Sequence, residues 1–140
     1  MASMDSSAKT LFLDANVLFS AAYREDAKLS QFWKLKKIKL ITSSYALEEA
    51  RRNLKSQEQR IRLEVLASKL KIISHDYMAE LPSEIILKDK DRPILAAAIH
   101  AKADFLITGD FQDFGTYFGT IIKGVTILPP ADYLAQKSKE

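Results

Sequence analysis

Acidic residues at four positions of this sequence lie beside short apolar segments. Asp14 directly follows "LFL", and Asp110 follows "FLIT" and one glycine. Asp91 precedes an alanine-rich segment, and Glu48 and Glu49 follow "ITSS" and three further residues. Carboxylates that are brought together repel one another unless a hard divalent cation binds them. Ligand sets of oxygen alone favour Mg²⁺ or Mn²⁺, and such ions support phosphodiester hydrolysis by a metal-activated water. If the fold brings these acids together, we expect that chemistry.

Each of these acids also has an ordinary structural role. Asp14 could cap the helix that follows it, Asp110 could belong to a turn, and Asp91 could lie in the first turn of a helix. Glu48 and Glu49 both flank the apolar stripe of their helix, so periodicity does not decide which of them faces a site. Four acids next to predicted strands in one small domain favour a metal site over four separate structural roles.

Three further polar residues lie close to these acids in the sequence. Asn16 could orient Asp14 or cap the helix itself. Thr108 could donate a hydrogen bond to a carboxylate or to a metal-bound water. Asp113 is a weaker candidate in the segment after Asp110. We therefore treat Asn16, Thr108 and Asp113 as supporting residues.

The acids must be positioned by an alternating series of strands and helices. Short apolar runs predict strands, and 3.6-residue periodicity predicts the helices between them. The predicted strands are residues 10–14, 38–43, 70–74, 104–108 and 124–128. The predicted helices lie within residues 15–36 (in two pieces), 44–70, 82–103 and 129–136. Because the strands lack clean period-2 alternation, we expect a parallel sheet that helices cover on both faces. Ligands of such sheets bind beyond the carboxyl ends of the strands, where the acids lie.

Composition predicts one soluble domain. The chain has 140 residues, 47% of them apolar, so we expect a single unit over 1–140 with a core of about 10–135 and frayed ends. It has no cysteine, no apolar run long enough to span a bilayer and no signal-peptide pattern, which favours a cytoplasmic protein without a membrane partner. The net charge is +3, and five lysines without an acid occupy residues 28–39. This segment is either a solvated face or a surface for phosphate backbones.

Three stretches of the sequence together resemble the PIN domain (PilT N-terminus) nuclease family, and in particular the VapC-type toxins of toxin–antitoxin pairs. They are "LFLDANVLFSA", "ITSSYALEEARRNL" and "DRPILAAAIHAKADFLITGDFQDF". The resemblance implies a Rossmann-like three-layer αβα fold with a five-stranded sheet in the order 3-2-1-4-5. It also implies a Mg²⁺- or Mn²⁺-dependent endoribonuclease whose metal-binding catalytic acids are Asp14, Glu49, Asp91 and Asp110, with Glu48 as the register alternative. The implied partners are RNA, a cognate antitoxin protein and a second copy in a homodimer.

Two other functions fit parts of the sequence. A phosphomonoesterase of the haloacid-dehalogenase type would use Asp14 as a nucleophile, but such enzymes carry an acid two residues later, where this chain has Asn16. A non-catalytic module that binds RNA or protein could keep the same fold, although the complete set of acids argues against it. The metal-dependent ribonuclease is therefore the leading hypothesis.

Overall fold

The fold is built on a mostly parallel sheet. A computed structural model describes residues 8–74 and 81–139, so part of the ends that we expected to be frayed lies outside the described residues. In the described chain the sheet has six strands in the order β3-β2-β1-β4-β6-β5, and only the β5–β6 pair is antiparallel. The strands are β1 (Lys9–Leu13), β2 (Ile38–Ser43), β3 (Lys71–Ile73), β4 (Phe105–Ile107), β5 (Ile121–Ile122) and β6 (Val125–Leu128). The five predicted strands and their order 3-2-1-4-5 are confirmed as β3-β2-β1-β4-β6.

The sixth strand was not predicted. β5 has only two residues and pairs in an antiparallel manner with the start of β6. Gly124, at a φ of 88°, lies in the tight turn between the two strands. A pair of isoleucines is too short for a periodic pattern, so the sequence carries no signal for this strand.

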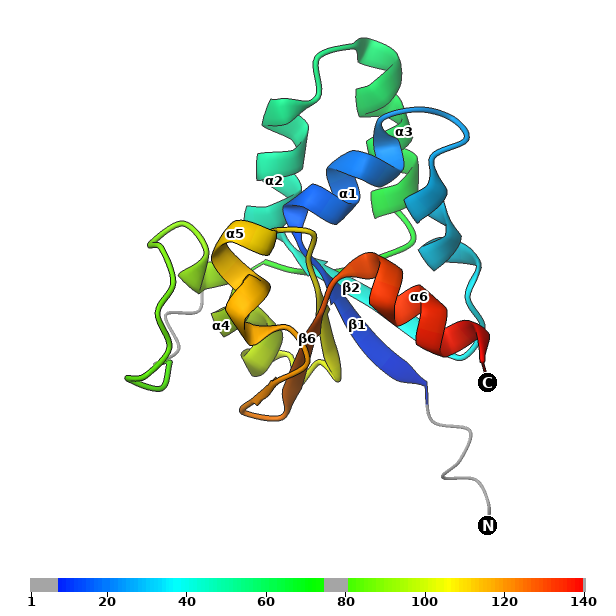
Figure 1. Cartoon of the computed structure of the whole chain (residues 1–140). Coiled ribbons are helices and arrows are strands. Elements are labelled where there is room, and N and C mark those ends of the chain that lie inside the picture. Colours follow the sequence, from blue (N-terminus) through cyan, green and yellow to red (C-terminus); the bar gives the residue numbers. More distant parts are fainter. Residues whose placement is uncertain (1–7, 75–80, 140) are drawn as a thin grey trace.

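Helices cover both faces of the sheet, which confirms the three-layer αβα architecture. The helical segments are α1 (Ala15–Ala22), η2 (Lys28–Lys34), α2 (Ser44–Asn53), α3 (Gln57–Ala67), α4 (Arg92–His100), α5 (Phe111–Phe114), η3 (Gly115–Tyr117) and α6 (Pro130–Ser138). In Figure 1, α1, α2 and α3 group together beyond one end of the sheet, and α4 and α6 lie on opposite sides of β1. In the described part of the chain, no helix is both long enough and apolar enough to cross a membrane.

Two predicted segments differ in detail. The second half of residues 15–36 is the 3₁₀ helix η2, separated from α1 by residues 23–27, so the predicted break is confirmed. The segment after Asp110, for which no helix was predicted, contains the four-residue helix α5. Asp110 is the N-cap of α5 and accepts a hydrogen bond from the backbone N–H of Asp113, which stabilises a helix too short to show periodicity.

The central strand β1 carries the core and fixes the position of the acidic edge. Leu11, Phe12 and Leu13 are fully buried, as expected for a strand with neighbours on both sides and helices on both faces. Leu13 lies opposite Ile107 of β4, and the backbone N–H of Asp14 donates to the carbonyl oxygen of Ile107 at 3.0 Å. β1 thus ends at Leu13, one residue before the predicted end. Because β1 and β4 are parallel, the residues that follow them lie side by side.

Candidate active site

Asp14 lies at the junction of β1 and α1 and is 4% exposed. Its Oδ1 accepts a hydrogen bond from the backbone N–H of Ala15 at 2.6 Å, so Asp14 caps α1. Its Oδ2 accepts from the hydroxyl of Thr108 at 2.8 Å and from the side-chain amide of Asn16 at 3.2 Å. We expected a ligand role in place of capping. The structure shows that capping uses one oxygen while the carboxylate still lines a pocket, so the two roles are compatible.

The environment of Asp14 disfavours its charged form. Burial raises the pKa of this carboxyl from 3.8 to about 6, and the hydrogen bonds from Thr108 and Ala15 only partly oppose that effect. The nearby carboxylates of Glu49 and Asp110 raise the pKa further. A carboxylate in this position gains from a cation that offsets both the burial and the repulsion.

Asn16 connects the two strand-to-helix junctions. Its side-chain N–H donates to Asp14 Oδ2 and, at 3.3 Å, to the hydroxyl oxygen of Thr108. Its side-chain oxygen accepts from the backbone N–H of Gly109 at 2.7 Å. The Thr108 hydroxyl oxygen also accepts from the backbone N–H of Asp110 at 3.1 Å. Asn16 and Thr108 therefore hold Asp14 at a fixed place beside Asp110, which fits the supporting role that we expected of them.

Three carboxylates at the site form a tight group that includes Asp110. One oxygen from each of Asp91, Asp110 and Asp113 lies within 4.8 Å of the other two. Asp91 is 5% exposed, and its buried Oδ2 has no hydrogen-bond partner among the described residues. An unpaired polar atom in a protein interior is costly. Asp113, which we treated as a supporting residue, belongs to this group.

Asp91 and Asp113 face each other as an interacting pair. Burial and the facing Asp113 raise the pKa of Asp91 to about 6. The facing Asp91 lowers the pKa of Asp113 to about 2, and Lys88 adds to that lowering. Two ionised carboxylates repel each other, so a proton shared between them or a nearby cation stabilises the pair. The unpartnered oxygen and the all-carboxylate donor set both fit a hard divalent cation.

The four predicted acids line one pocket of about 390 Å³. Its walls are formed by Asp14, Ala15, Asn16, Phe19, Glu49, Asn53, Lys90, Asp91 and Asp110. The structure also resolves the register of α2. Glu49 is half-buried and lines the pocket, whereas Glu48 is exposed and forms an ion pair with Arg51 at 3.4 Å. Of the two glutamates, Glu49 is thus the one at the site.

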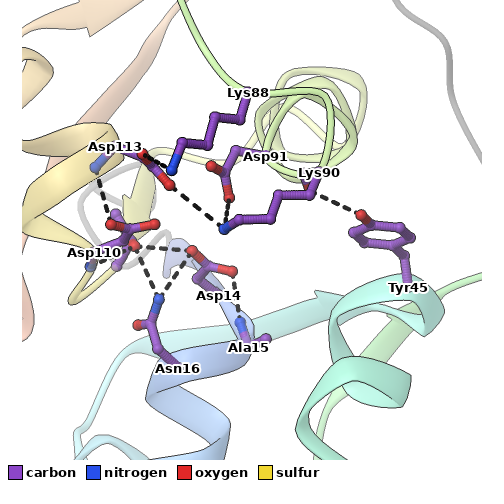
Figure 2. A network of polar contacts seen from close by, with 10 residues as sticks. Asp14, Ala15, Asn16, Tyr45, Lys88, Lys90, Asp91, Asp110 and Asp113 are labelled. Carbon is purple, nitrogen blue, oxygen red and sulfur yellow. Dashed lines mark hydrogen bonds and ion pairs between the residues drawn. The ribbon is translucent and has the colours of Figure 1, made fainter. Parts of the chain in front are cut away.

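Two lysines contact the acidic group and were not predicted. Lys90 Nζ lies 3.3 Å from Asp91 Oδ1 and 3.4 Å from Asp113 Oδ2 (Figure 2). Lys88 Nζ lies 3.3 Å from Asp113 Oδ1. The hydroxyl of Tyr45 donates to the backbone oxygen of Lys90 at 2.8 Å and fixes this segment to α2. The alternation in "KDKD" is the signal that could have drawn attention to these lysines, since it places a cation next to each acid.

The lysine-rich segment begins near the site. Its first residue, Lys28, lines a second pocket of about 400 Å³ with Tyr23 and Arg24. Phe19 belongs to the walls of both this pocket and the acidic one, so the two hollows adjoin. Basic side chains thus line a hollow that adjoins the acidic pocket, where a phosphate backbone could run.

Comparison with known proteins identifies relatives of the fold. The family model for the PIN domain matches residues 10–112. A chain from the structure of VapBC2 from Rickettsia felis, bound to a DNA fragment from their promoter, is 20% identical with a TM-score of 0.65, and the match covers 86% of this chain and 98% of that one. A chain of VapBC-1 from nontypeable Haemophilus influenzae is 16% identical (TM-score 0.54; coverage 87% and 98%). A chain of FitAB bound to an IR36 DNA fragment is 15% identical (TM-score 0.52; coverage 86% and 94%). No curated protein sequence matched the chain.

Proposed function

This chain belongs to the PIN domain family, and we propose that it is a Mg²⁺- or Mn²⁺-dependent endoribonuclease, the toxin of a toxin–antitoxin pair. The observation that carries the nuclease proposal is the buried Oδ2 of Asp91, which lacks a hydrogen-bond partner within the described chain and lies in a group of three carboxylates. Two members of that group, Asp91 and Asp110, line the pocket that Asp14 and Glu49 also line. Such a set of oxygens is suited to a hard divalent cation.

Asp91, Asp110 and Asp113 would hold a divalent cation, and Asp14 and Glu49, which line the same pocket, would complete the site. When bound, the cation supplies Lewis acidity that lowers the pKa of water and stabilises negative charge on a phosphodiester.

The polar residues around Asp14 serve to keep it in place. Asn16 and Thr108 both donate to its Oδ2, so this oxygen cannot rotate away from the pocket without losing two hydrogen bonds. The basic side chains of Lys28 and Arg24, which line the adjoining pocket, would contact the RNA backbone.

The toxin assignment rests on the fold. Two of the similar structures are VapBC assemblies, and the similarity covers 86% and 87% of this chain. We propose by analogy that this chain acts on RNA in the cytoplasm, forms a homodimer and binds a cognate antitoxin protein. Co-expression with the product of a neighbouring small gene, followed by co-purification, tests the last of these proposals.

The nuclease proposal is tested by incubating the protein with a panel of RNAs and Mn²⁺ or Mg²⁺. We expect cleavage that EDTA abolishes and that Asp14→Asn and Asp110→Asn reduce at least about 100-fold, since each removes a charged ligand from the site. Glu48→Gln is the matched control, because it removes an exposed carboxylate outside the pocket and should leave cleavage unchanged. Cleavage that persists in EDTA or in both aspartate variants would refute the mechanism.

A phosphomonoesterase with an Asp14 nucleophile is less compatible with this site. Both oxygens of Asp14 already accept hydrogen bonds, from Ala15 on one side and from Thr108 and Asn16 on the other. Asn16 is itself engaged with Gly109, and its amide is neither acidic nor basic enough to exchange a proton with a leaving group. Trapping a phosphorylated Asp14 would revive this alternative.

A further inference from the structure

We propose that Lys90 is a cation switch of the acidic site: its ammonium group holds Asp91 and Asp113 when no metal is bound, and it binds a phosphate of the substrate once a divalent cation takes these carboxylates. The inference rests on the proposed function and deepens it. It assigns a role to a side chain that contacts two acids of the group and faces the same pocket as Asp14 and Glu49.

The first half of the switch follows from the contacts of Lys90. Its Nζ lies 3.3 Å from Asp91 Oδ1 and 3.4 Å from Asp113 Oδ2, so one ammonium bridges two carboxylates that face each other. Asp110 brings a third oxygen within 4.8 Å of both acids. A divalent cation bound to this group would be coordinated by the same two carboxylates that Lys90 contacts. The ammonium and a divalent cation therefore compete for them.

The second half follows from where Lys90 points. Among the described residues that line the acidic pocket, Lys90 has the one basic side chain. The side chain is 54% exposed, while Tyr45 fixes its backbone oxygen with a hydrogen bond of 2.8 Å. Because the backbone of Lys90 is held in place and its side chain is flexible, its ammonium group can move between two nearby anions. When a divalent cation binds its carboxylate partners, a substrate phosphate in the pocket offers this charge a new partner.

Lys88 provides a matched control for Lys90. Its side chain is 60% exposed and its ammonium lies 3.3 Å from Asp113, but the ammonium forms no ion pair with Asp91 and the residue does not line the acidic pocket. Replacing either lysine with glutamine removes one positive charge close to the acidic group. A difference between the two variants therefore reports on the position of Lys90 and not on net charge.

The first measurement is Mn²⁺ binding without RNA, followed by electron paramagnetic resonance. We expect Lys90→Gln to tighten Mn²⁺ binding about tenfold, because the competing charge-assisted contacts to two carboxylates are lost. Lys88→Gln should tighten it about twofold or less, because only one contact to one carboxylate is lost. Equal effects of the two variants, or weaker Mn²⁺ binding by Lys90→Gln, would overturn the competition.

The second measurement is the binding of a labelled phosphorothioate oligoribonucleotide at saturating Mn²⁺, followed by fluorescence anisotropy and with its integrity checked on a gel. We expect Lys90→Gln to weaken binding about tenfold and Lys88→Gln to leave it within about twofold. Unchanged affinity of Lys90→Gln would overturn the switch. Neither measurement requires cleavage. An effect specific to Lys90 in a protein that cuts no RNA would support the switch and refute the nuclease. RNA cleavage without an effect specific to Lys90 would support the nuclease and refute the switch.

Discussion

Replacing Asp14 with asparagine should change how the stability of the metal-free protein depends on pH. Burial raises the pKa of Asp14 from 3.8 to about 6. An acid with a raised pKa stabilises the fold below its unfolded pKa, and this contribution is lost as the pH rises through the folded pKa. The full loss is about 3 kcal/mol, because each pH unit between the two pKa values is worth about 1.4 kcal/mol. Roughly 1.4 kcal/mol of it falls between pH 5 and pH 8.

Urea unfolding in EDTA at pH 5 and pH 8 measures this effect. We expect the free energy of unfolding of Asp14→Asn, relative to the unmodified protein, to rise by about 1.4 kcal/mol between the two pH values. Asparagine also presents a donor to Thr108 and Asn16, which costs about 1–3 kcal/mol at either pH, so the change with pH is the informative quantity. Glu48→Gln, which removes an exposed carboxylate, should show no such change. A difference that stays constant or falls toward pH 8 would refute the account of Asp14.

Three further outcomes are expected. Glu49→Gln should reduce RNA cleavage at least about 100-fold and Glu48→Gln less than threefold in a gel assay, because only Glu49 lines the acidic pocket; equal loss would contradict this register. Asn16→Ala should lower the free energy of unfolding by about 1–3 kcal/mol, because the substitution leaves the N–H of Gly109 without its acceptor. A change below about 0.5 kcal/mol would contradict this role of Asn16. Mn²⁺ at about 100 times its dissociation constant should raise the free energy of unfolding by about 2.7 kcal/mol, and Asp110→Asn should reduce this gain at the same Mn²⁺ concentration; an unaltered gain would remove Asp110 from the ligand set.

The sheet was predictable because its strands are short apolar runs separated by helical periodicity. All five predicted strands are present, and the fold class and strand order are confirmed. What the sequence did not reveal is short: the two residues of β5, the four residues of α5 and the three residues of η3. Elements of this length are fixed by a turn or by a cap such as Asp110, and a hydrophobic period needs more residues to be visible.

The grouping of the acids was predictable in part. The parallel pairing of β1 with β4 brings Asp14 next to Thr108, as expected for residues at the carboxyl ends of neighbouring strands. Periodicity did not decide between Glu48 and Glu49, because both flank the apolar stripe. The resemblance implied Glu49, and the packing of α2 places Glu49 and not Glu48 at the acidic pocket. The contacts of Lys90 were not predictable either, because they depend on how its side chain reaches from the segment before α4 to Asp113 of α5. The catalytic roles themselves stay predictions.

The local roles of the acids explain how a small fold tolerates so many carboxylates in one place. Asp14 is the N-cap of α1, Asp110 is the N-cap of α5, and Asp91 directly precedes α4. The start of a helix carries partial positive charge and free backbone N–H groups, which favour a carboxylate there. Each acid is therefore stabilised by its own helix start, and this stabilisation helps the acids to lie close together. What the helix starts do not satisfy is the buried Oδ2 of Asp91, and this remaining oxygen is the strongest indication that the site binds a cation.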